Sequence, residues 1–294
     1  GDVYKRQVIY NTFNMGVFML KLVILIIYFA VLIGIGLYCR KHATDVNGFV
    51  LGGRSVGPWL TAFAYGTSYF SAVVFVGYAG QFGWKYGIAA TWAGIGNAII
   101  GSLLAWVVLG RRTRIMSQHL DSATMPQYLG KRFGSNPLKI GASVIIFIFL
   151  IPYTASLYNG LSRLFGMAFN IDYSVCIIIM ATLTAIYVIA GGYMATAIND
   201  FIQGIIMLFG IVAVIAAVIH SKGGFMSALQ GLANVSDPAV SDTPGIFASF
   251  FGPDPFNLLC VVILTSLGTW GLPQMVQKFY AIDNEASIQK GTCL

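Results

Sequence analysis

Seven long apolar stretches limit the folds open to this chain. They run roughly over residues 17–38, 58–80, 87–110, 139–168, 174–191, 200–220 and 257–277. A helix needs about 20 apolar residues to cross a bilayer, and β-strands would be much shorter. Only 9% of the residues are charged, against about 25% in soluble domains. The sequence therefore predicts an all-α, polytopic membrane helix bundle.

Basic residues are distributed unevenly between the two sides of these predicted spans. Eleven lie on one side: Arg40, Lys41, Arg54, Arg111, Arg112, Arg114, Lys131, Arg132, Lys139, Lys278 and Lys290. Six lie on the other: Lys5, Arg6, Lys21, Lys85, Arg163 and Lys222. Loops rich in Lys and Arg stay in the cytoplasm, which predicts a cytoplasmic first loop and an external N-terminus. The net charge of +7 is thus an orientation signal and does not indicate nucleic-acid binding.

Two polar segments are predicted to lie outside the helical bundle. Residues 1–14 begin with Gly rather than Met and include the polar run GDVYKRQ, so we expect them to be poorly ordered or foreign. Residues 221–256 are the longest hydrophilic stretch and are predicted to form an extracellular connection. The sequence stops at Leu294 without a natural-looking end, as expected of a C-terminally truncated fragment.

The second apolar stretch is interrupted by polar residues. Thr67, Ser68, Tyr69 and Ser71 closely follow Gly66. Backbone that leaves a helix in hydrocarbon strands N–H and C=O groups at several kcal/mol each, so a break here indicates a cavity. Freed carbonyl and hydroxyl oxygens suit a hard cation such as Na⁺. Alternatively, the hydroxyls bond to carbonyls one turn earlier or pack against a neighbouring helix.

A second interruption lies in the last apolar stretch. Gly268, Gly271 and Pro273 fall within six residues, and proline both removes a helical hydrogen bond and clashes with the preceding turn. Paired breaks in two halves of a chain are typical of transporter binding sites. Trp270, inside this break, is a candidate substrate-binding residue. The alternative is a simple kink at the cytoplasmic end.

Asp200 is the third candidate, because it is the only acid near the membrane between Asp172 and Asp237. It could complement the dipole at the start of the sixth helix, with Asn199 as the N-cap. It could instead be a carboxylate in an inner ion pathway. The sequence has no phosphate-binding glycine loop, no metal-ligand spacing and no catalytic pair of acids, so we expect neither an enzyme nor a cofactor.

Three short motifs lie at the ends of the predicted spans. Residues 51–58 read LGGRSVGP, residues 124–128 read TMPQY before Arg132-Phe133, and residues 190–195 read AGGYMA before NDFIQ at 199–203. Together they resemble motifs of the sodium/solute symporter family, which carries proline, pantothenate, sugars and sialic acid. The resemblance covers about residues 19 to 291.

This resemblance implies a five-plus-five inverted-repeat (LeuT-like) fold. On that plan, residues 15–40 are an extra N-terminal transmembrane helix and residues 58–220 are the first five-helix repeat. Residues 221–256 connect the repeats, and residues 257–294 start a truncated second repeat. The resemblance also implies sodium-coupled symport by alternating access across the cytoplasmic membrane.

The family's site residues can be matched to positions in this sequence. Its cation site uses main-chain oxygens that match Thr67 and Phe70, with hydroxyls from a later helix that would lie beyond residue 294. Asp200 matches an acid that some members use at an inner cation site. The coupling ion is thus expected to be Na⁺, and the expected partners are Na⁺, a small solute and the lipid bilayer.

The solute-contacting positions of the family match Tyr69, Ser71 and Val74. Val74 cannot bond a sugar hydroxyl, and proline carriers place an acid where Tyr69 stands, so both substrates fit the family pattern poorly. The string YFSA at 69–72 is similar to members that carry small carboxylates. The predicted solute is a small organic molecule of that kind. The alternative function is a transporter-like solute-sensing domain of a larger signalling protein.

Overall fold

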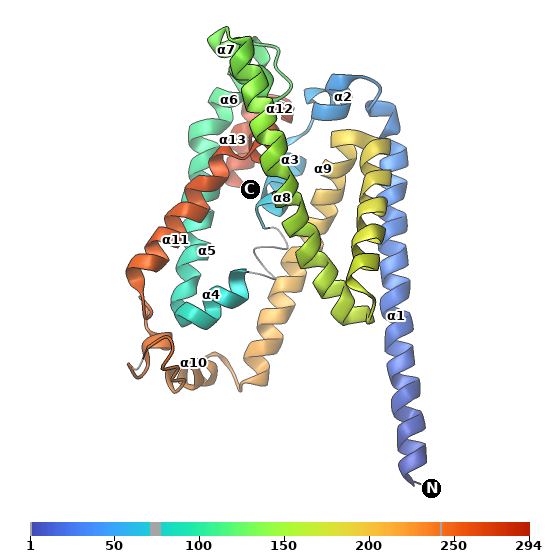
Figure 1. The fold of residues 1–294 in the computed structure, drawn as a ribbon, viewed down its shortest axis with the longest axis vertical. Coiled ribbons are helices and arrows are strands. Elements are labelled where there is room, and N and C mark those ends of the chain that lie inside the picture. The colour runs from blue at the N-terminus through green and yellow to red at the C-terminus, as the bar shows by residue number, and fades with distance from the viewer. Residues whose placement is uncertain (1, 71–77, 242) are drawn as a thin grey trace.

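The computed structural model describes residues 2–70, 78–241 and 243–294, with side chains from residue 15 onward except His42. Apart from two isolated β-bridges, the regular structure of these ranges is helical (Figure 1). Four described helices are long and apolar enough to cross a membrane: Met15–Cys39 of α1 (Asp2–Cys39), Ala79–His119, α8 (Asn136–Phe169) and α9 (Tyr173–Ser221). A bent helix pair, α11 with α12, makes a fifth candidate.

Shorter helices complete the fold. They are α2 (Val46–Leu51), α3 (Pro58–Tyr69), α4 (Ala79–Tyr86), α5 (Thr91–Gly96), α6 (Arg111–His119), α7 (Met125–Phe133), α10 (Phe225–Ala233), α11 (Pro255–Gly268), α12 (Pro273–Ala281) and α13 (Glu285–Cys293). Two π-helical segments, Asn97–Leu104 and Trp106–Gly110, continue α5 into α6. The predicted span ended at residue 110. The helix runs on to His119, because the basic residues that follow Gly110 remain helical.

The long helix α9 is two helices joined at a glycine. A straight helix of 49 residues would be about 73 Å long, more than twice the roughly 30 Å of bilayer hydrocarbon. Gly192 has φ 58° and ψ −151°, a conformation essentially limited to glycine. The chain turns back there, and the two parts of α9 run in opposite directions (Figure 1). The two predicted spans, 174–191 and 200–220, correspond to these two parts.

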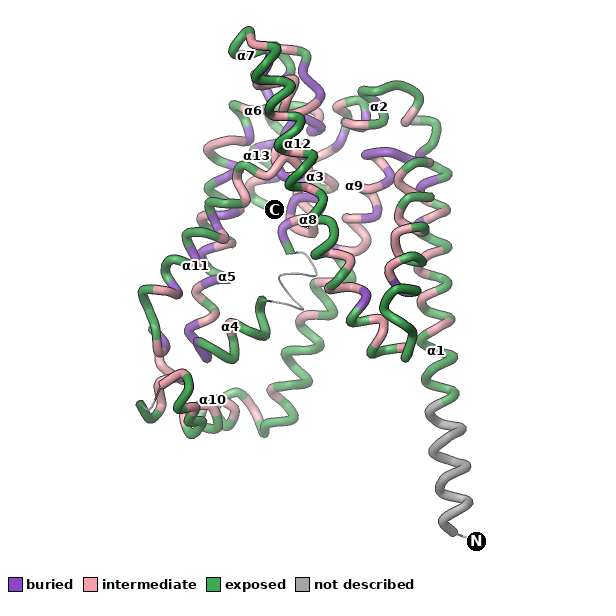
Figure 2. Tube along the Cα trace, in the orientation of Figure 1, coloured by how far each residue is buried: buried purple, intermediate pink, exposed green. Residues whose placement is uncertain are grey.

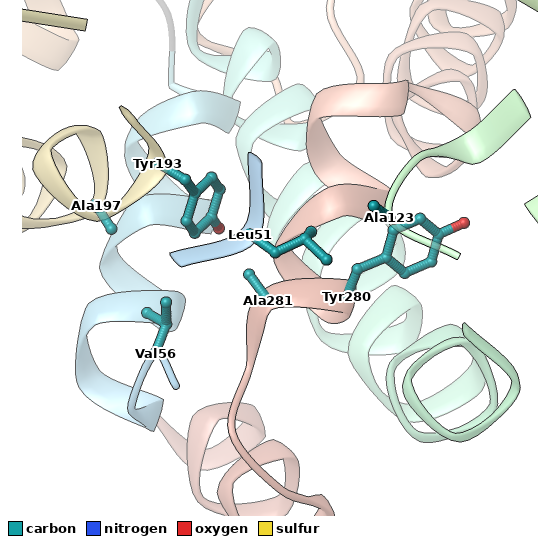
Figure 3. Close-up of a cluster of buried hydrophobic side chains, with 7 residues drawn as sticks. All are labelled: Leu51, Val56, Ala123, Tyr193, Ala197, Tyr280 and Ala281. Atoms are coloured by element: carbon teal, nitrogen blue, oxygen red, sulfur yellow. The ribbon is translucent and has the colours of Figure 1, made fainter. Parts of the chain in front are cut away.

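Burial is concentrated at one end of the molecule. There, α3, α6, α12 and α13 meet and most of the buried positions gather (Figure 2). One apolar cluster joins Leu51, Val56, Ala123, Tyr193, Ala197, Tyr280 and Ala281, which come from five different segments (Figure 3). In contrast, the most apolar 18-residue window of α8 has no buried residue. Such an exposed apolar surface suits lipid rather than water.

Two arginines at this end bind main-chain carbonyls near the end of α12, in the turn before α13 and in the loop between α6 and α7. Arg54 donates to the carbonyls of Ser122 at 2.8 Å and Tyr280 at 3.4 Å. Arg114 donates to the carbonyls of Ile282 at 2.6 Å and Asp283 at 2.9 Å. Burial lowers the pKa of Arg54 from its ordinary value, but a guanidinium stays protonated in proteins. The contacts fix the chain after the second break to the first half of the fold.

Candidate cation and solute site

The first break lies at the end of α3. This helix begins with Pro58 at its first position, where a missing N–H costs nothing, and its last residue is Tyr69. Phe70 has φ −86° and ψ 68°, outside the helical region, and its N–H donates to the carbonyl of Gly66 at 2.9 Å. Two predicted solute contacts, Ser71 and Val74, lie outside the described residues.

Thr67 stands in the last turn of α3, with its hydroxyl turned back into the helix. The hydroxyl lies 2.9 Å from the carbonyl of Phe63 and 3.3 Å from that of Ala64, to either of which it can donate. This is the local bonding that Ser and Thr often show in helices. The side chain of Thr67 is therefore satisfied within its own helix. The predicted cation ligand at this position is the main-chain oxygen of Thr67, not its hydroxyl.

The second break separates α11 from α12. After Gly268 the chain makes one 3₁₀ turn over Thr269–Gly271, and Leu272 is extended with ψ 126°. Helix α12 then restarts at Pro273, bent by 50° from the preceding helix. The interruption coincides with the two glycines and the proline.

A cavity of about 820 Å³ reaches both breaks. Thr67, Ser68 and Phe70 line it from the first break, and Pro273, Gln274 and Gln277 from the second. Its other walls come from α1, α8 and α9: Tyr28, Leu150, Tyr153, Thr154, Leu157, Leu161, Gln203, Ile206 and Met207. None of these lining residues is charged. The cavity thus offers hydroxyls, amides and helix-end backbone within mostly apolar walls, the usual make-up of a small-molecule site.

Asp200 forms an ion pair with Lys278 of α12. The Lys278 Nζ lies 3.3 Å from Asp200 Oδ2, and the side chains are 8% and 24% exposed. The ammonium also lies 5.2 Å from the centre of the Tyr193 ring, within cation–π range. The pair joins the second part of α9 to the second broken helix.

The expected capping role of Asn199 is wrong. The second part of α9 begins after Gly192, so Asn199 and Asp200 lie two turns inside the helix rather than at its start. Asn199 is buried, and both polar atoms of its amide lack a hydrogen-bond partner among the described residues. The predicted span began at residue 200, but the helix resumes directly after Gly192, whose backbone alone departs from helical geometry.

Tyr69 and Trp270 do not line the cavity. The Tyr69 hydroxyl donates to Asn97 Oδ1 at 2.8 Å, and the Trp270 indole N–H donates to the carbonyl of Ile100 at 2.9 Å. Both side chains thus connect a helix break to the π-helical segment Asn97–Leu104. Their predicted role as solute contacts stays a prediction.

Sequence reasoning missed three residues of this region: Asn97, Gln274 and Lys278. Asn97 is the only amide in the predicted span 87–110, and a polar side chain at membrane depth is itself a signal. The Gln274 amide is buried with no hydrogen-bond partner among the described residues. Lys278 was counted only as an orientation signal, although it lies in the same broken span as Trp270.

The sequence is similar to those of known proteins. The sequence profile of the Sodium:solute symporter family matches residues 49–294. The chain is similar to the osmoregulated proline transporter OpuE of Bacillus subtilis (strain 168), with 31% identity over 259 residues, 87% of this chain and 51% of that protein. It is also similar to the sodium/proline symporter of Staphylococcus aureus (strain JH9), with 31% identity over 282 residues, 91% of this chain and 51% of that protein. The chain spans about half the length of these relatives.

Proposed function

Because the chain belongs to the sodium:solute symporter family, a family of transporters and not of enzymes, we propose that it forms part of a carrier that couples Na⁺ entry to uptake of a small organic solute. The observation that carries this proposal is the cavity shared by the two helix breaks. Breaks of this kind are tolerated at membrane depth where they line a cavity, and transporters use them to bind ions and solutes.

Na⁺ is proposed to bind at the end of α3, through the main-chain oxygens of Thr67 and Phe70. Among the residues that the structure describes, no three His, Cys, Asp or Glu side chains come together. A hard cation near this cavity would therefore depend on carbonyl and hydroxyl oxygens. Asp200 is proposed as a second, inner position on the cation pathway, reached once Lys278 moves away.

The remaining architecture is proposed to be the inverted-repeat fold of the family. Residues 58–220 would be its first repeat, and residues 257–294 the start of its second, placing one broken helix at the beginning of each. Alternating access would then rock one bundle against the other around the cavity. A single Na⁺ moving through about 100 mV releases about 2.3 kcal/mol, and a tenfold gradient adds about 1.4 kcal/mol. Together these sustain roughly 500-fold accumulation of a neutral solute.

The proposed solute is a small carboxylate. Two relatives are a proline transporter and a sodium/proline symporter, and proline itself carries a carboxylate. The family pattern at Tyr69 departs from that of proline carriers, which favours a carboxylate other than proline. Uptake of labelled proline and of labelled pantothenate, driven by a Na⁺ gradient into vesicles containing the full-length protein, separates the two. Competition by unlabelled monocarboxylates extends the test.

Cysteine scanning tests the cation site directly. In the full-length protein with its native cysteines replaced, single cysteines at positions 64–70 are treated with a water-soluble thiol reagent. We expect positions 67 and 70 to react, and Na⁺ but not K⁺ to protect them. Phe209→Cys, on an exposed apolar face of α9, is the control that should not respond to Na⁺. Uniform lack of reaction across 64–70 would overturn the proposal in favour of a packed helix.

A further inference from the structure

A hydrogen-bonded cluster connects the two helix breaks through one amide. Asn97 Oδ1 accepts from the hydroxyl of Tyr69 at 2.8 Å and from that of Ser266 at 3.1 Å. Tyr69 is the last residue of α3, and Ser266 lies in the last turn of α11. A single oxygen atom on a third element thus receives one donor from each broken helix.

Further contacts strengthen this connection. The Thr269 hydroxyl lies 3.3 Å from the Tyr69 oxygen, so the two breaks also touch each other directly. The Trp270 indole is bonded to the carbonyl of Ile100, one turn beyond Asn97. Ser266 is fully buried and Tyr69 nearly so, and buried hydrogen bonds are costly to break without replacement.

Close packing limits how these groups can move independently. A side chain at Gly101 would clash with the Tyr69 hydroxyl, and one at Gly96 would clash with Val262 of α11. Small residues at such positions let membrane helices approach each other closely. The segment 96–101 is therefore wedged between the end of α3 and α11. A displacement of Tyr69 must either carry Asn97 with it or break the 2.8 Å bond.

We propose that Asn97 is a positioning residue that couples the two breaks, so that cation binding at the end of α3 changes the setting of Trp270 in the second break. This inference rests on the proposed function, because it takes Na⁺ binding near Thr67 and Phe70 as its input. Asn97 itself touches neither ion nor solute in this scheme. Its Oδ1 transmits a shift of Tyr69 to Ser266, and the adjacent helical turn transmits it to the Trp270 indole.

The test measures input and output in the same full-length protein. Trp270 is kept as the only tryptophan, and its fluorescence is followed as Na⁺ replaces K⁺. Protection of Thr67→Cys from a thiol reagent by Na⁺ reports the input separately. Asn97→Leu should keep the protection, with a half-effective Na⁺ concentration raised about tenfold for the loss of one to two buried hydrogen bonds. It should lose the Trp270 response.

Asn159 offers a matched control. Its Oδ1 also accepts two donors, from Arg163 at 3.0 Å and Tyr173 at 3.1 Å, but it lies on α8 and outside the connection between the breaks. Asn159→Leu should leave both readouts unchanged. Asn97→Asp keeps the accepting oxygen and should restore the Trp270 response, which a merely structural role for residue 97 does not require.

Milder variants cover the case in which Asn97→Leu does not fold. Tyr69→Phe and Ser266→Ala each remove one donor and should each weaken the Trp270 response. Their combination should do no more than Asn97→Leu, because all three act through one oxygen. A Trp270 response unaffected by Tyr69→Phe and Ser266→Ala, with Na⁺ protection intact, would overturn the inference alone. Absence of Na⁺ protection in the wild-type background would instead overturn the proposed cation site, and the inference with it.

Discussion

At the scale of single residues, Lys278 combines a buried charge with an ion pair and an aromatic contact. Its ammonium is almost fully buried, faces the Asp200 carboxylate at 3.3 Å and lies over the Tyr193 ring. Taking a charge out of water is costly unless a partner compensates it. Removing one member of the pair therefore leaves an uncompensated buried charge, whereas removing both members does not.

Lys278→Met should destabilise the protein by about 3–5 kcal/mol, because it leaves the Asp200 carboxylate without its partner. Lys278→Arg should cost much less, since it keeps the charge. The double variant Asp200→Asn, Lys278→Met should recover most of the loss, because no unpaired charge remains. The midpoint of thermal unfolding of the purified protein in detergent measures all three. Equal midpoints for wild type and Lys278→Met would show that the pair contributes nothing.

At the scale of elements, the turn at Gly192 decides whether α9 is one helix or two. The residue has a positive φ, and a Cβ there would lie 2.8 Å from the Phe49 carbonyl oxygen. Both the backbone conformation and the space therefore require glycine. No other described position in α9 has helix-breaking dihedral angles.

Gly192→Ala should lower the free energy of unfolding by at least about 1–3 kcal/mol from the backbone conformation alone, with the contact to Phe49 adding to this. Gly210→Ala, in the same helix, is the control. It is helical, and nothing lies within 4 Å of a Cβ built there, so it should be neutral or stabilising by up to about 1 kcal/mol. Thermal midpoints and folded yield in membranes compare the two. Similar losses in both variants would contradict the argument.

The elements themselves could largely be predicted from the sequence, but their contacts could not. Apolar length indicated α1, α8 and the two parts of α9, and the glycines with Pro273 indicated the second break. Two boundaries were wrong, because α6 continues through a basic run and the second part of α9 resumes directly after Gly192 rather than at residue 200. The ion pair with Lys278 and the Asn97 connection join residues 78 and 169 positions apart. Helix periodicity indicates which face of a helix is apolar, but it does not indicate which residue of another helix that face contacts. Such distant contacts therefore become visible only in the fold.

At the scale of the whole molecule, the loops separate into two ends. The basic loops around α2, α6 and α7 lie at one end, and α10 lies at the opposite end (Figure 1). The dense Lys and Arg clusters of the sequence therefore lie together at one end of the molecule. By the positive-inside rule, we expect that end to face the cytoplasm.

Cysteine labelling in intact cells tests this orientation. Ala239→Cys, exposed near α10, should react with a membrane-impermeant thiol reagent added outside, because it would lie in the external connection. Asn136→Cys, exposed at the start of α8, should react only after the membrane is permeabilised. Both variants are made with the native cysteines replaced. Labelling of Asn136→Cys alone in intact cells would invert the proposed topology.

The two arginines that bind residues 280–283 have a consequence for how this contact can evolve. Arg54 and Arg114 hold peptide carbonyls, and every amino acid carries a peptide carbonyl. Substitutions in the held segment keep the bonds as long as an apolar side chain still fills the interior there. Replacing either guanidinium, even by lysine, loses the planar fork of donors. Across related proteins, residues 280–283 should therefore vary in side chain, whereas Arg54 and Arg114 should be nearly invariant.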